Sequence, residues 1–142
     1  MNQLLSSLRS QLRKTQQLLP SLLQEWFERE AILPGSLYIL RRKCGKPSCH
    51  CTRGELHEST VLSYRGKGRP QNITPATEHV ESVRNLTERY RRCRKARARL
   101  VRWQKQLLKL VDELEAVRVQ LGEAEFRKQA TPRVRQPRSS RS

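Results

Sequence analysis

The chain has few of the residues from which a large protein interior is built. Hydrophobic residues make up 35% of its 142 residues, and aromatic residues only 5%. No run reaches the length of about eighteen apolar residues that a membrane-spanning helix needs, so that class of protein is excluded. A small fold that buries so little surface usually needs a cross-link or a bound metal. We therefore expect one small domain, with or without a tail.

Acidic residues are also scarce. The chain has 13 Asp and Glu against 30 Lys and Arg, and its formal net charge is +17. Such self-repulsion disfavours a compact state unless a polyanion neutralises it. The charge predicts a nucleic acid partner, either DNA or RNA, with acidic lipid surfaces as the main alternative. No secretory leader is recognisable at the N-terminus, which predicts a cytoplasmic or nucleoid-associated protein.

Three of the four cysteines lie in one short segment. Cys44, Cys49 and Cys51 follow the spacing C-x4-C-x-C, and His57 comes six residues later. Three thiolates and one imidazole form the donor set of a closed tetrahedral zinc site, and the Gly and Pro of the first interval suit a tight loop. We predict that these four residues bind a structural Zn²⁺. Four protein ligands leave no open position for a metal-bound water, so the prediction includes no metal catalysis.

Other interpretations of the same residues remain open. His50, between two cysteines, is an alternative fourth ligand, although a residue placed there usually points away from the ion. The cysteines are alternatively free buried thiols or disulfide partners, with Cys93 as the one cysteine outside the segment. A catalytic thiol beside His50 is a further interpretation, but the sequence indicates neither an acid to orient the base nor an oxyanion donor.

The order of patterns along the chain predicts an α+β fold that is mainly helical. Residues 1–33 carry leucines at helical spacing and form an N-terminal amphipathic helix, with a kink or a new start near Leu19 because Pro20 lacks a backbone donor. Residues 34–75 form a zinc-binding β module. Residues 76–127 form a long basic helix with a heptad pattern, from which Gly122 begins the exit. Residues 128–142 form a disordered basic tail.

Within the β module we expect a three-stranded antiparallel sheet. The strands are predicted at 36–43, 60–65 and 71–74, and the glycine-containing segment 66–70 reads as a hairpin connection. The cysteine loop then lies between the first two strands. So small a sheet needs the metal and the flanking helices to hold it together.

The long helix carries an unbroken apolar stripe at alternating spacings of four and three, which must face another helix. The N-terminal helix has a matching stripe, so we expect an antiparallel helical hairpin with the zinc sheet at its bend. A homodimer or the docking of a partner helix is the alternative. The residues offered for such a contact are Leu100, Trp103, Leu107, Leu110, Leu114 and Leu121.

Basic residues gather in two places, around the cysteine loop and around Cys93 in the long helix. A solvated helix face normally mixes signs, but the nearest acidic residue to the second group is Glu88. Both groups are predicted to contact nucleic acid phosphates rather than base edges, so binding should tolerate sequence. The predicted residues are Arg41, Arg42, Lys43, Lys46, Arg53, Arg65, Lys67, Arg69, Arg89, Arg91, Arg92, Arg94, Lys95, Arg97, Arg99 and Arg102.

Four segments resemble a family of small bacterial and archaeal proteins classed as a domain of unknown function. The family pattern has a CGKPxCxC knuckle, a histidine shortly after it, a YLSYR-like strand and a long charged helix. The matching segments are Gly35-Ser-Leu-Tyr38, Arg41-Arg-Lys-Cys44-Gly-Lys-Pro-Ser-Cys49-His-Cys51, Arg53-Gly-Glu55 with His57, and Leu62-Ser-Tyr-Arg65. The family's His-Gly-Pro-Tyr is replaced here by His57-Glu-Ser-Thr60. Because some members accompany mobile elements, the resemblance implies an accessory role there, without supplying an activity.

Together these patterns predict a non-catalytic, zinc-stabilised nucleic acid-binding protein, an accessory to a mobile element or a ribonucleoprotein. The alternative is a helical adaptor that dimerises or docks a partner through its stripe. An enzyme is disfavoured, because phosphoryl transfer usually needs clustered carboxylates for Mg²⁺ and the acidic residues here are scattered.

Overall fold

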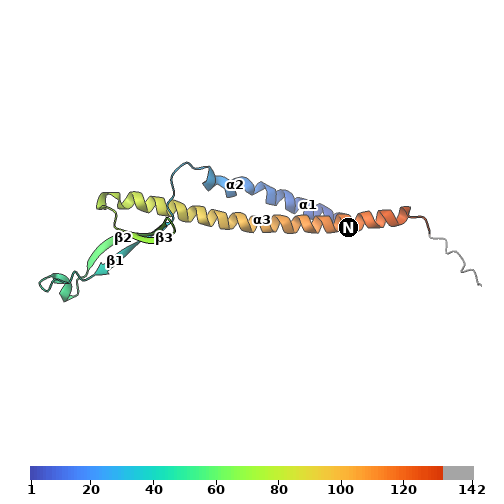
Figure 1. Cartoon of the computed structure of the whole chain (residues 1–142). Helices are drawn as coiled ribbons and strands as arrows, with labels where there is room; N and C mark the ends of the chain where they lie inside the picture. The colour runs from blue at the N-terminus through green and yellow to red at the C-terminus, as the bar shows by residue number, and fades with distance from the viewer. Residues whose placement is uncertain (133–142) are drawn as a thin grey trace, which may run out of the picture. The chain divides into compact units, whose positions relative to one another are not determined.

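The computed structural model describes residues 1–132 and confirms a mainly helical α+β fold (Figure 1). The chain divides into two compact units, each described by itself. One contains Met1–Leu18 together with the chain from Arg102 on, and the other contains Leu19–Val101. Both units include part of the same long helix, so the units do not follow the order of elements along the chain.

The N-terminal segment is helical over a shorter range than 1–33. Helix α1 spans Asn2–Gln17, α2 spans Leu19–Leu23, and a 3₁₀ turn, η1, spans Gln24–Phe27. The new start at Leu19 confirms the effect expected of Pro20, which cannot donate to the preceding turn. The prediction of helix up to residue 33 is wrong, because Glu28 already has extended backbone angles, with φ −68° and ψ 146°.

In the first unit, α1 packs against the C-terminal part of α3, which spans Val80–Gln129. The two helices run antiparallel, as predicted (Figure 1). Near the end of α1 the indole Nε1–H of Trp103 donates to the carbonyl oxygen of Thr15 over 2.6 Å. The buried side chains of this unit are Leu5, Leu8, Leu110 and Val117, with Leu12, Leu114 and Leu121 packed against them.

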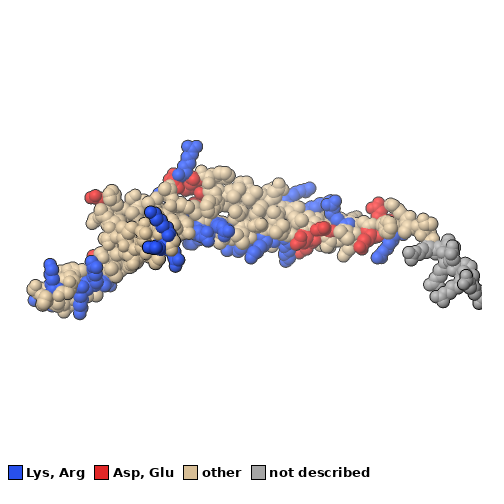
Figure 2. Space-filling model, viewed as in Figure 1, with Lys and Arg blue, Asp and Glu red and all other residues tan. Residues whose placement is uncertain are grey.

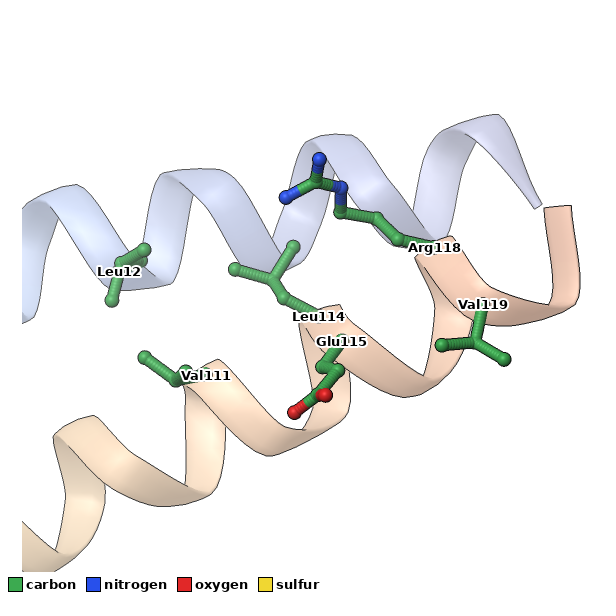
Figure 3. A pocket seen from close by; sticks show the side chains of 6 residues that line it. All are labelled: Leu12, Val111, Leu114, Glu115, Arg118 and Val119. Atoms are coloured by element: carbon green, nitrogen blue, oxygen red, sulfur yellow. The ribbon is translucent and has the colours of Figure 1, made fainter. Parts of the chain in front are cut away.

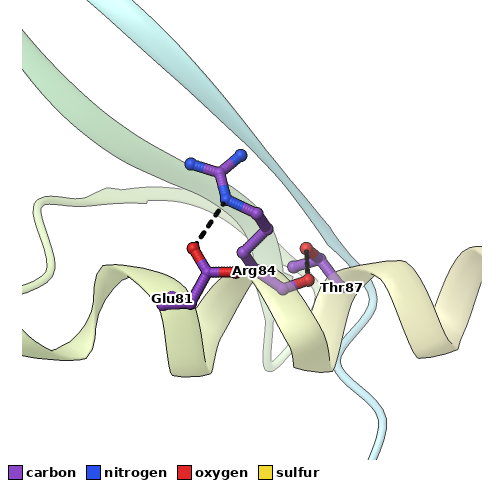
Figure 4. Close-up of polar contacts among 3 residues, drawn as sticks. All are labelled: Glu81, Arg84 and Thr87. Carbon is purple, nitrogen blue, oxygen red and sulfur yellow. Dashed lines mark hydrogen bonds and ion pairs between the residues drawn. The ribbon is translucent and has the colours of Figure 1, made fainter.

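Helix α3 begins after a 3₁₀ turn, η3, at Thr77–His79. In its first turns Arg84 pairs with Glu81 over 3.4 Å, and the buried Thr87 hydroxyl donates to the Arg84 carbonyl over 2.9 Å (Figure 4). The expected exit at Gly122 is wrong, because the helix continues to Gln129. One exposed glycine costs a helix only about 1 kcal/mol, which the helix-forming residues that follow it offset. The predicted tail begins inside α3, and from residue 133 on it lies outside the described residues.

The second unit contains the predicted three-stranded antiparallel sheet in the order β1-β2-β3. Strand β1 spans Gly35–Arg42, β2 spans His57–Gly66 and β3 spans Arg69–Ile73. The hairpin loop is only Lys67 and Gly68, whose φ angles of 53° and 77° match the two-residue turn that suits strand twist. β3 therefore starts earlier than expected and includes Pro70, which an edge strand tolerates because the missing donor faces outward.

β1 and β2 are joined by the cysteine loop, residues 43–56, which together with His57 we call the knuckle. The register pairs Arg42 with His57, so the loop leaves and re-enters the sheet at paired positions. Val61 and Leu62 of β2 are buried in this unit, as are Cys93 and Ala96 of α3. Within residues 1–132, no helix combines the length and the hydrophobicity that a membrane span requires.

Candidate metal centre and basic surfaces

The backbone of the knuckle folds into tight turns that bring distant donors together. Cys49 N–H donates to the Lys46 carbonyl over 3.2 Å, and a 3₁₀ turn, η2, follows at His50–Arg53. The Thr52 hydroxyl donates to the Cys49 carbonyl over 2.8 Å. Gly45 and Gly54 have φ angles of +81° and +103°, a region that side chains rarely adopt. The two glycines therefore allow the turns between Cys44 and Cys49 and between Cys51 and His57.

The four side chains predicted as ligands lie together at the base of these turns. One donor atom from each of Cys44, Cys49, Cys51 and His57 falls within 4.8 Å of the others. The Sγ atoms of Cys44 and Cys51 are 3.5 Å apart, and Cys49 Sγ lies 3.1 Å from His57 Nε2. Bonds of about 2.3 Å to sulfur and about 2.0 Å to nitrogen would place tetrahedral donors about 3.5–3.8 Å apart. The cluster therefore has the donors and nearly the spacing that a tetrahedral metal site requires.

His57, rather than His50, belongs to this cluster. The His50 ring is exposed, with Nδ1 3.8 Å from Cys49 Sγ, and it packs edge-on against the His57 ring at 4.9 Å between centroids. His57 is the first residue of β2, so the sheet fixes its position. All four cysteines are free thiols, and Cys93 is buried in the long helix apart from the cluster.

The surroundings of the thiols favour different protonation states in the absence of a metal. The Lys46 backbone N–H, followed by the Cys49 and Cys51 thiols, lowers the pKa of Cys44 to about 6. Cys51 is fully buried and accepts the Cys44 backbone N–H over 3.5 Å, which favours its thiolate. Burial and the neighbouring Cys44 and Cys49 nevertheless raise the pKa of Cys51. Two adjacent thiolates repel each other, and a divalent cation between them removes that repulsion.

The basic residues of the knuckle are largely unpaired. Figure 2 shows Lys and Arg side chains gathered over it. Arg41 pairs with Glu58 across the sheet over 2.9 Å. Within the described part of the chain, none of the other predicted cations of the sheet and knuckle makes an ion pair: Arg42, Lys43, Lys46, Arg53, Arg65, Lys67 and Arg69.

The basic group on α3 is less uniform than the sequence predicted. Arg92 lies 3.6 Å from a Glu25 carboxylate oxygen and 4.0 Å from one of Glu28. Arg89 donates to the Ala31 carbonyl over 3.0 Å. The expectation of a basic group with little local compensation is therefore wrong for Arg92, whose partners lie in η1 and the segment after it. The acidic residues were visible in the sequence, but their position beside α3 depends on the path of that segment.

The rest of the group remains available to an external anion. Arg91, Lys95 and Arg99 follow one another at intervals of four, so they line one exposed face of α3. Arg94 and Arg97 are also exposed, and so is Arg102, which belongs to the first unit. None of these six residues has an ion pair within residues 1–132.

A groove of about 650 Å³ lies in the first unit beside the buried stripe (Figure 3). It is lined by Leu12 of α1 and by Val111, Leu114, Glu115, Arg118 and Val119 of α3. Val111 and Val119 are exposed, whereas α1 of the same chain packs on Leu110 and contacts Trp103. Helix α1 therefore covers part of the stripe that was predicted to bind a partner. The groove lies beside the covered part and has exposed apolar side chains in its lining.

Comparisons of this chain with protein-family models, with curated proteins and with solved structures find no match. The site is therefore interpreted from its own geometry. That geometry provides a Cys₃His cluster suited to a metal ion, with unpaired cations around it.

Proposed function

We propose that the protein is a non-catalytic, zinc-stabilised nucleic acid-binding protein. Zn²⁺ bound by Cys44, Cys49, Cys51 and His57 would cross-link the two ends of the knuckle. The donor set favours zinc, because thiolates with one imidazole in a tetrahedral arrangement suit this ion better than the harder Mg²⁺ or Ca²⁺. The resemblance to proteins that accompany mobile elements fits an accessory role of this kind.

The observation that carries the proposal is the coincidence of a metal-binding cluster with unpaired positive charge. His57 pairs with Arg42 in the register of β1 and β2, and Cys44 follows Lys43 in the sequence. In residues 1–132 the sheet and knuckle together hold seven unpaired cations, more than three thiolates need for neutralisation. Exposed Lys and Arg held on a rigid scaffold bind phosphates by charge and by release of counterions, with little dependence on base sequence.

Fluorescence anisotropy with labelled duplex DNA and labelled single-stranded RNA tests the proposal. We expect binding to at least one of them, with an affinity that falls steeply as salt rises. Five phosphate contacts would give a slope of about −4.5 in a plot of log affinity against log salt. No binding at low salt, or a slope near zero, would refute it. Tighter binding to anionic vesicles at equal salt would favour the lipid alternative, and metal-dependent cleavage of the nucleic acid would refute the non-catalytic part.

Assembly through a second copy of this chain is a second candidate, favoured by the groove in Figure 3. Glu115 and Arg118 lie three residues apart on its edge, so they share one helix face. A two-fold axis between antiparallel α3 helices would bring each Arg118 near the Glu115 of the other copy, while Val111 and Val119 fill the apolar part.

Analytical ultracentrifugation tests this second candidate. Glu115→Arg should weaken the dimer, since it places two arginines near each other. The added substitution Arg118→Glu should restore the dimer by reversing the ion pair. A wild-type monomer at high concentration, or a double variant that dimerises no better than the single one, would leave the groove without this role.

A further inference from the structure

A cavity of about 400 Å³ opens beside the metal cluster and is lined by Arg42, Lys43, Cys44 and His57. Arg42 is the last residue of β1 and pairs with His57, the first residue of β2. Side chains of such a pair project from the same face of a sheet. The cavity therefore combines two cations with two of the four candidate metal ligands.

The two cations of this cavity, unlike Arg41 beside them in the sequence, have no internal anion among the described residues. Arg41 belongs to the opposite face of β1, because successive strand residues alternate, and Glu58 neutralises it there over 2.9 Å. Arg42 and Lys43 are exposed and make no ion pair within residues 1–132. Glu58 therefore neutralises the charge of Arg41 on one face of the sheet, while the charges of Arg42 and Lys43 at the cavity are not neutralised by any described residue.

The cations of α3 present a contrasting arrangement. Arg92 is held by Glu25 and Glu28, and Arg89 by a backbone carbonyl. The unpaired Arg91, Lys95 and Arg99 lie on a convex helix surface, where long side chains must give up rotamer freedom to hold a ligand. The cavity instead has two cations in its lining, a planar guanidinium, which can donate two parallel hydrogen bonds to a phosphate, and a compact ammonium.

We propose that this cavity is the principal phosphate-binding subsite and holds a phosphodiester of the nucleic acid backbone. The inference rests on the proposed function and assigns its strongest contact. Because Cys44 and His57 line the same cavity, a metal that fixes them also fixes the walls of the phosphate site. Metal binding and nucleic acid binding are therefore coupled at the knuckle, while the helix cations add affinity that does not depend on the metal.

The test compares two double variants that remove the same charge. Arg42→Gln with Lys43→Gln empties the cavity of cations, and Arg91→Gln with Lys95→Gln removes two from the helix face. Each is titrated with a labelled 20-nucleotide duplex and with single-stranded RNA across a salt series. We expect the cavity variant to lose at least about tenfold in affinity and to reduce the salt slope by about 1.8, the value for two lost phosphate contacts. The helix variant should lose less in affinity.

Zinc removal provides the second arm of the test. A chelator should weaken the wild-type protein about as much as the cavity substitutions do, and it should weaken the cavity variant little further. Zinc content measured by native mass spectrometry checks that the cavity variant keeps its knuckle. If the cavity variant loses zinc, the single variant Arg42→Lys takes its place in the test. Arg42→Lys keeps the charge but not the bidentate donor, so it should weaken nucleic acid binding by a smaller factor than the cavity variant was expected to.

The outcomes separate this inference from the proposed function. If the helix variant loses as much affinity as the cavity variant, the cavity is not the principal subsite. The proposal of nucleic acid binding would stand in that case. Binding that survives chelation unchanged would overturn the coupling. Failure of the wild-type protein to bind either nucleic acid would overturn both. About 10 mM inorganic phosphate should displace the labelled nucleic acid much less efficiently than unlabelled duplex does. Equal displacement would show a site for free phosphate and overturn the assignment to the backbone.

Discussion

Replacing Leu110 by alanine should destabilise the helical unit strongly, because its side chain is 2% exposed among Leu5, Leu8 and Val117. The substitution removes three carbons, and burial of each contributes about 0.8 kcal/mol, which gives about 2.4 kcal/mol. A rigid cavity would raise the cost toward about 5 kcal/mol. The nearby groove lets side chains and water fill the space, so we expect a value near 2.5 kcal/mol, or about a 60-fold fall in the ratio of folded to unfolded unit.

Trp103 gives a direct assay of this unit, since its indole donates to the Thr15 carbonyl across the two helices. In a Trp26→Phe background its fluorescence can be followed during urea unfolding. The matched control is Leu108→Ala, because Leu108 lies on the same helix and is 52% exposed. That control should change the free energy of unfolding by less than about 0.5 kcal/mol. Equal effects of the two substitutions would refute the packing of α1 on this face of α3.

Two further predictions concern the knuckle. Zinc binds thiolates, and the pKa of Cys51 is raised while that of Cys44 is about 6. Zinc affinity should therefore rise with pH from 6 to 8, and binding at pH 7 should release protons. Competition with a chromophoric chelator measures the affinity, and a flat pH profile would contradict the prediction. Gly54→Ala meets no atom within 4 Å but strains a φ of +103°. The strain of about 1–2 kcal/mol should weaken zinc binding roughly 5- to 30-fold in the same assay. Gly122→Ala, in open helix, should leave zinc affinity unchanged.

The parts of the fold that the sequence predicted correctly depend on local signals. Lys67 and Gly68 form a tight hairpin because glycine tolerates a positive φ, and Pro20 ends a helix because it lacks a donor. The heptad stripe requires a facing helix, and α1 is one in the same chain. The four candidate ligands are close in sequence, so their convergence followed from a short loop. The preference for His57 over His50 was made from the sequence, and the position of His57 at the start of β2 agrees with it.

The parts that the sequence did not predict depend on contacts between distant segments. Arg92 meets Glu25 and Glu28 only because the chain between η1 and β1 returns along α3, where Leu33 N–H donates to the Leu86 carbonyl over 3.1 Å. These contacts also decide which cations remain unpaired, and so which surface is open to phosphate.

Native mass spectrometry of the protein purified with zinc decides whether the knuckle binds a metal ion. We expect one Zn²⁺ per wild-type chain and per Cys93→Ser chain, since Cys93 lies outside the cluster, and none in Cys51→Ser, which removes the fully buried donor. Wild-type protein without metal, or Cys51→Ser protein that still carries one zinc per chain, would contradict this expectation.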